Sequence, residues 1–212
     1  MRLVSDGQPI NAAPESPPSP RQGLAQPLGP EHLEAIALAR QQARKIMRAA
    51  SVAAFSGWTT AVFAIFTLLG GLFSVPAFLL GAALVLIAHI ELKAGKGLRR
   101  FDLNAPQRLG FNQLGLWAVL TLYSGWSIAQ ALLAPGPYES YLAAGGDLAN
   151  TIKPIARLNM IVTVAIYAAL IVCSAIAQGG AALYYFTRRG HMHQFLSRTP
   201  PWIVQMLRAA AS

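Results

Sequence analysis

The chain has 212 residues, of which 54% are hydrophobic and 12% are charged, and its formal net charge is +9. Soluble domains carry about 25% charged residues, so this composition argues against a soluble domain and indicates a lipid environment. The bases stand beside apolar runs and not on a polar face of their own, which excludes nucleic acid as the expected partner and favours anionic lipid headgroups.

The first 30 residues hold seven of the 14 prolines, at positions 9, 14, 17, 18, 20, 27 and 30. A segment of this composition cannot bury enough apolar surface to offset the entropy lost on ordering, so residues 1–30 are predicted to be disordered. Residues 31–48 follow with apolar positions on one side and bases on the other, interrupted by Arg40. They are predicted to form a basic amphipathic helix at the cytoplasmic surface of a membrane.

Four apolar segments come next, at about residues 49–73, 76–92, 114–133 and 159–186. The first contains no charged residue in 25 positions, whereas about 20 residues suffice to cross the bilayer core. We therefore predict an all-α fold: a polytopic helical bundle over residues 49–190 with four transmembrane helices, arranged as two closely joined hairpins. Residues 191–212 are predicted to be a cytoplasmic C-terminal tail.

The distribution of bases predicts how the four segments are oriented in the membrane. Most bases flank the segments on one side, whereas the loops on the opposite side contain only Lys153 and Arg157. Because Lys and Arg resist translocation, both termini are predicted to be cytoplasmic, in the inner (plasma) membrane. The stretch "HIELKAGKGLRRFD", residues 89–102, is then first of all a signal that stops and orients the first hairpin. The bases on the predicted cytoplasmic side are Arg40, Arg44, Lys45, Arg48, Lys93, Lys96, Arg99, Arg100, Arg108, Arg188, Arg189 and Arg198.

His89 and Glu91 lie within this stretch, but positions two apart on a helix do not face each other. Both are predicted to be interfacial polar residues without a buried partner. The motif "RRGHMH" adds His191 and His193, which with His89 are weak candidates for a metal site. No cysteine and no second histidine at helical spacing supports such a site, so no metal, haem or other cofactor is expected.

The spans contain polar residues that could pair between helices or line a path: Ser124, Gln130, Ser174 and Gln178. Glu91 lies too near the end of its span to count as core, and the polar residues within the membrane core do not titrate near neutrality, so the core is predicted to lack a proton carrier. The sequence also lacks an HExxH or GxSxG motif, and the protein is predicted not to be an enzyme.

Three stretches resemble an uncharacterised family of small four-span bacterial inner-membrane proteins: "SVAAFSGWTTAVFAIFTLLGGLFS", "LRRFDLNAP" with "LGFNQLGL", and "ALYYFTRRGHMHQFLSRTPPWIV". The resemblance covers about residues 44–204. It implies four spans behind a variable, proline-rich head, and it implies no activity.

Two functions remain open at this stage. The leading one is a non-enzymatic scaffold, assembly factor or lipid-interacting subunit, with a membrane protein partner or a second copy of the chain beside it. The alternative is a small transporter or channel for a neutral solute, acting as an oligomer. Polar side chains that converge on a hydrated cavity would favour transport, whereas dispersed and paired side chains would favour the subunit. The loop 134–158 is a passive connection, a cap on the bundle or a contact with a partner.

Overall fold

The computed structural model describes residues 29–210, so the prediction for residues 1–30 lies outside the described residues except for Gly29 and Pro30. The chain divides into two compact units, residues 1–37 and 38–212, each of which is described by itself. Within residues 29–210 the regular structure is entirely helical, which confirms the all-α prediction. The helices are α1 (Pro30–Gly71), α2 (Val75–Arg99), α3 (Ala105–Leu133), α4 (Glu139–Ala143), α5 (Gly146–Arg198) and α6 (Pro201–Ala210).

In the first unit, the described residues are the start of α1. Pro30 is the first helical residue, where its missing N–H costs nothing, and Glu31 stands in the first turn, where the helix dipole favours a negative charge. The backbone N–H groups of His32 and Leu33 both donate to the carbonyl of Gly29. These contacts explain why the helix begins here.

Four helices, α1, α2, α3 and α5, are long and apolar enough to cross a membrane, as predicted. Their length and composition are those of a multi-pass membrane protein. The helices are longer than the apolar segments: α2 continues to Arg99, α3 begins at Ala105, and α5 has 53 residues. The segment 191–212, predicted as a tail, contains the last turns of α5 and all of α6.

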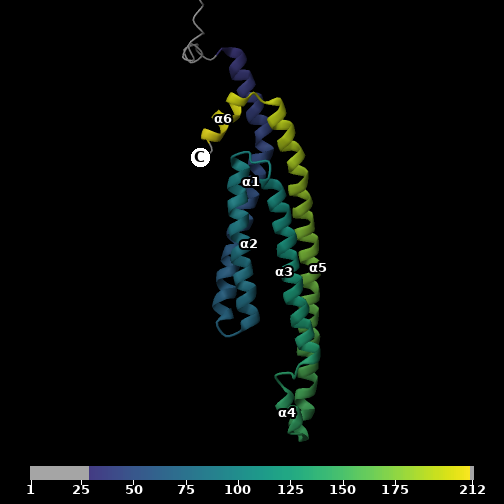
Figure 1. Ribbon diagram of the computed structural model, residues 1–212. Helices are drawn as coiled ribbons and strands as arrows, with labels where there is room; N and C mark the ends of the chain where they lie inside the picture. Colours follow the sequence, from purple (N-terminus) through teal and green to yellow (C-terminus); the bar gives the residue numbers. More distant parts are fainter. Residues whose placement is uncertain (1–28, 211–212) are drawn as a thin grey trace, which may run out of the picture. The chain divides into compact units, whose positions relative to one another are not determined.

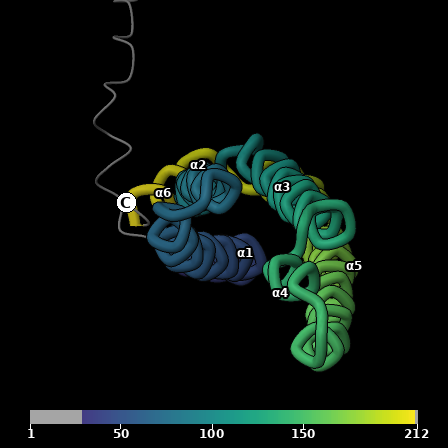
Figure 2. The backbone as a smooth tube through the Cα atoms, turned by 90° about the horizontal axis from the view of Figure 1, so that it is seen from below, coloured from purple at the N-terminus to yellow at the C-terminus, as the bar shows by residue number. Residues whose placement is uncertain are grey.

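The second unit places each long helix beside its neighbour in the chain (Figure 1). Seen along the helices, α1, α2, α3 and α5 follow one another around an arc (Figure 2). Successive helices run in opposite directions. One end therefore holds residues 38–48 of α1 and the C-terminal ends of α2 and α5, and we call it the basic end. The other holds the turn between α1 and α2 together with α4, and we call it the α4 end.

Small residues let α1 and α2 approach closely. A Cβ atom on Gly81 would come within 2.8 Å of the Leu68 side chain, and one on Gly57 would come within 2.9 Å of the Leu92 side chain. The residue numbers of both facing pairs add to the same total, so the antiparallel register does not slip along the hairpin. The buried face of α1 repeats at intervals of three and four residues, as in close-packed membrane helices: Ala50, Ala53, Gly57, Thr60 and Ala64.

At the basic end, an aromatic contact joins the end of α2 to α5. The rings of Phe101 and Phe195 stack with their centroids 5.2 Å apart, and both side chains are buried. Phe101 follows the end of α2 and has a φ of 56°, which is uncommon for a residue with a large side chain. Each phenylalanine precedes a proline by five residues, Pro106 and Pro200, so the two copies of this short sequence pattern meet in space.

Candidate functional site

The carboxyl group of Glu91 is the most buried charged group among the described residues. Its side chain is 0% exposed, and Oε1 accepts a hydrogen bond of 2.7 Å from Nε2 of Gln113, which is itself buried. Oε2 is buried without a hydrogen-bond partner in the described part of the chain, although the Ser56 hydroxyl lies nearby. Tyr185 of α5 is buried and close enough to interact with the carboxyl electrostatically. Four helices therefore contribute a polar side chain to one buried cluster.

Regular packing explains why Glu91 is inside. The buried residues of α2 recur at intervals of three and four, and Glu91 occupies one of these positions. The same rule puts Gln113 on the buried face of α3, next to Asn112, whose amide donates a 3.1 Å hydrogen bond to the carbonyl of Ile87. The repeat on α2 consists of Gly81, Leu84, Ala88, Glu91, Gly95 and Leu98.

The prediction that Glu91 has no buried partner is therefore wrong, whereas its depth in the membrane stays a prediction. Lys93 and the bases that follow it predict how deep Glu91 lies, but they say nothing about which side of the helix it occupies. His89, two positions away, is exposed, in agreement with the expectation that the two do not face each other.

A layer of apolar side chains borders this cluster on the side toward the α4 end. It is built from Ala64, Leu84, Ile87 and Leu116, with Leu80, Val119 and Leu120 packed against it. Polar groups reappear beyond it, beginning with Ser124 on α3, which is fully buried and whose Oγ has no partner among the described residues.

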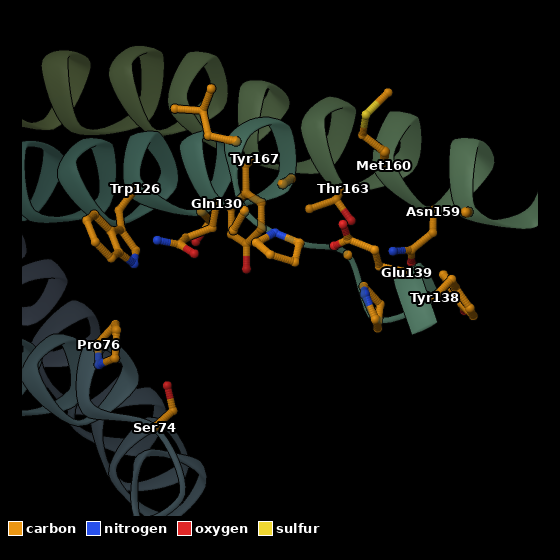
Figure 3. Close-up of a pocket in the computed structure, with 18 of the residues that line it drawn as sticks. Ser74, Pro76, Trp126, Gln130, Tyr138, Glu139, Asn159, Met160, Thr163 and Tyr167 are labelled. Atoms are coloured by element: carbon orange, nitrogen blue, oxygen red, sulfur yellow. The ribbon is translucent and has the colours of Figure 1, made fainter. Parts of the chain in front are cut away.

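At the α4 end, a hollow of about 940 Å³ lies between the start of α2, the end of α3, α4 and the first third of α5. We call it the α4-end hollow. Trp126 and Gln130 point across it toward Ser74 and Pro76 (Figure 3). Aromatic rings and hydroxyl or amide groups make up much of its wall. Besides those four residues, its lining includes Tyr123, Ser127, Tyr138, Glu139, Asn159, Thr163 and Tyr167.

The structure places the four residues of the predicted polar path in different surroundings. Gln130 lines the α4-end hollow, and Ser124 is buried on the same helix. Ser174 donates a 3.0 Å hydrogen bond to the carbonyl of Ile171 in its own helix, and Gln178 is half-buried and does not line the hollow. Sequence reasoning missed Gln113, the partner of Glu91. This residue directly precedes the apolar segment predicted at 114–133, so it was not counted among the polar residues of the spans.

At the basic end, a smaller hollow of about 400 Å³ lies between α1 and α5. We call it the basic groove. Its floor is formed by Ile46 and Phe195, both buried, and its rim carries Lys45, Arg198 and His191. The described lining is completed by Gln41, Gln42, Gln194 and Leu38, and none of the described residues that line the groove is acidic.

The structure does not gather the three histidines predicted as weak metal candidates. His89, His191 and His193 are all exposed, and only His191 lines the basic groove. The ring of His191 is within 3.0 Å of the carbonyl oxygen of Thr187, through Nδ1. Within residues 29–210, no three or more His, Cys, Asp or Glu side chains lie close enough to hold a metal ion.

Comparisons of this chain with protein-family models, with curated proteins and with solved structures found no match. The resemblance to small four-span inner-membrane proteins stays a prediction.

Proposed function

We propose that this protein is a non-enzymatic, multi-pass subunit of the inner membrane that binds anionic lipid at its basic end, with both termini in the cytoplasm. The observation that carries the proposal is the composition of the basic groove. Within the part of the chain that the structure describes, its rim holds two permanent positive charges, Lys45 and Arg198, and no negative one, and its floor is apolar.

The two parts of the groove match the two parts of a phospholipid. A guanidinium such as that of Arg198 can donate two parallel hydrogen bonds to a phosphate, while Lys45 acts as a compact point charge. Leu38, which is exposed, offers an apolar surface to the first methylene groups of an acyl chain beside the buried Ile46 and Phe195. One turn before His191, Arg188 lies over the ring of Tyr184 at 4.5 Å and keeps its Nε buried without a partner in the described residues, so a further donor is available nearby.

The charge distribution supports the proposed orientation. The bases that flank the spans concentrate at the basic end, against Lys153 and Arg157 at the α4 end. Bases next to the cytoplasmic leaflet gain about 1 kcal/mol each from its anionic lipids. The same bias that would retain this end in the cytoplasm would also bring anionic headgroups to the groove.

Lipid-dependent stability tests the proposal. The protein is purified in an uncharged detergent, and its thermal unfolding is measured with phosphatidylglycerol or with phosphatidylcholine of the same acyl chains. A ligand at 100 times its dissociation constant stabilises the folded state by about 2.7 kcal/mol, so specific binding gives a clear difference between the two lipids. We expect phosphatidylglycerol to stabilise the protein more.

Two double variants identify the groove. Lys45→Gln with Arg198→Gln should remove most of the preference for phosphatidylglycerol. Lys93→Gln with Lys96→Gln removes the same charge from exposed positions of α2 outside the groove and should leave most of the preference. If the control variant loses as much of the preference for phosphatidylglycerol, the lipid is attracted by the overall charge and not by the groove. If the native protein is stabilised equally by both lipids, the proposal is wrong.

A transporter for a neutral solute is the second candidate, and the α4-end hollow is the observation that favours it. Gln130 and the neighbouring hydroxyl groups could solvate a polar molecule there. Uptake of small labelled solutes into proteoliposomes, compared between the native protein and Gln130→Leu, would test this function. A lack of uptake by the native protein for every solute tried would leave the subunit as the better proposal.

A further inference from the structure

The α4-end hollow is distinguished by the kind of side chains that line it. Four aromatic rings contribute to it: Tyr123 and Trp126 from α3, Tyr138 from the loop before α4, and Tyr167 from α5. The rings of Tyr123 and Tyr167 meet edge to face with centroids 5.9 Å apart. The faces of aromatic rings are electron-rich and attract cations, most strongly where water is excluded.

Charge separates this hollow from the basic groove. Among the described residues that line it, Glu139 is the one that carries a charge, and none is Lys, Arg or His. The nearest bases along α5, Lys153 and Arg157, are exposed and do not belong to its wall. A protein with a net charge of +9 thus combines, among the described residues that line the α4-end hollow, one negative charge with four aromatic rings and no positive charge.

We propose that the α4-end hollow binds an organic cation with apolar substituents, such as a quaternary ammonium or phosphonium group. Its volume of about 940 Å³ lies within the range of roughly 300–1,000 Å³ that is typical of small-molecule sites. The apolar substituents pack against the rings and Pro76, and Glu139 balances the positive charge. This inference goes beyond lipid binding at the basic groove and does not depend on it, because the two hollows share no lining residue.

Two probes of the same shape and opposite charge test the assignment: tetraphenylphosphonium and tetraphenylborate. Equilibrium dialysis of the full-length protein in an uncharged detergent, with protein-free micelles subtracted, measures the binding of each. The expected result is saturable binding of the phosphonium ion that tetraphenylborate does not displace. Equal saturable binding of both ions, or none of the cation, overturns the proposal.

Matched variants locate the site. Trp126→Leu should weaken phosphonium binding about fivefold, since a cation–π contact contributes on the order of 1 kcal/mol. Trp117→Leu changes a comparably exposed tryptophan on the same helix outside the hollow and should leave binding unchanged. Glu139→Gln should weaken binding severalfold at low salt, whereas Asp147→Asn, outside the hollow, should not. An equal loss in a variant and its control would place the cation elsewhere and overturn the proposal.

A lipid headgroup and a free molecule could both supply a quaternary ammonium group, and competition separates these sources. Phosphatidylcholine and phosphatidylethanolamine are added in turn to the protein saturated with phosphonium. Displacement by phosphatidylcholine alone identifies a lipid headgroup, and retention of the probe against both lipids identifies a free cation. Trp126→Phe keeps an aromatic face and should keep most of the binding, which distinguishes a lost contact from a misfolded protein.

Discussion

The hydrogen bond between Gln113 and Glu91 gives the sharpest test of the packing in this bundle. Gln113→Leu keeps a side chain of similar size but removes the donor to Oε1, and Oε2 already lacks a partner in the described residues. Hydrogen bonds to charged groups contribute about 1.5–3 kcal/mol, whereas hydrogen bonds between membrane helices average about 0.6 kcal/mol. The 2.7 Å distance and complete burial of Glu91 favour the larger value, so we expect a loss of at least about 1.5 kcal/mol in the free energy of unfolding.

Thermal unfolding in detergent measures this loss, and for a chain of this size about 1.5 kcal/mol corresponds to a shift of roughly 3–6 °C in Tm. Gln130→Leu is the matched control, because Gln130 is an exposed glutamine on the same helix. A double-mutant cycle with Glu91→Gln isolates the pairwise contribution. Two results would contradict a stabilising contact between Glu91 and Gln113. One is a loss of Tm in Gln113→Leu no larger than in Gln130→Leu, and the other is a coupling free energy below about 0.5 kcal/mol.

Three further outcomes are expected. Gly81→Leu should destabilise the hairpin by about 1–3 kcal/mol, because any Cβ there overlaps α1, whereas Gly125→Leu has open space and should change Tm little; equal effects would contradict the packing. Phe195→Ala should lower the free energy of unfolding by about 3–5 kcal/mol through the lost stack and the cavity, and a loss below 1 kcal/mol in thermal unfolding would argue against that contact. In a cysteine-free background, cysteines at positions Ser74 and Ser140 should react with an impermeant maleimide only from the periplasmic side, and labelling of both from the cytoplasm would invert the topology.

Hydropathy predicted the existence and the order of the spanning helices, because each contains a long apolar run. It did not predict where the helices end. The amphipathic segment 31–48 and the first span 49–73 were separate elements in the sequence, yet α1 runs through both without a break. Backbone hydrogen bonds extend a helix through polar residues as readily as through apolar ones, so a change in polarity marks a membrane boundary and not a helix boundary.

The buried cluster around Glu91 and the α4-end hollow could be predicted from the sequence less well than the fold. A signal for Glu91 was present in the repeat of small and apolar residues at intervals of three and four, which continues from Gly81 through Glu91 to Gly95. Its partner Gln113 is 22 positions away on another helix, so the pairing depends on the register between α2 and α3, which no local pattern specifies. The α4-end hollow likewise exists only because residues 74–76, 123–142 and 156–167 meet in space.

An apolar layer separates the buried cluster around Glu91 from the polar groups toward the α4 end, and it bears on the choice between a membrane subunit and a transporter. On α3, Gln113 and Ser124 are eleven residues apart, which is about 16 Å along a helix, and Leu116 lies in the packed layer between them. A polar solute that crossed this distance would lose its hydrogen bonds to water without gaining others, and each unsatisfied group would cost several kcal/mol. Transport through a single copy of the bundle therefore requires Leu84, Ile87 and Leu116 to separate, whereas binding at either hollow requires no such movement. The packed arrangement thus favours a membrane subunit that binds its ligands at the two ends of the bundle, and it makes the apolar layer the place where a transport mechanism would first have to be demonstrated.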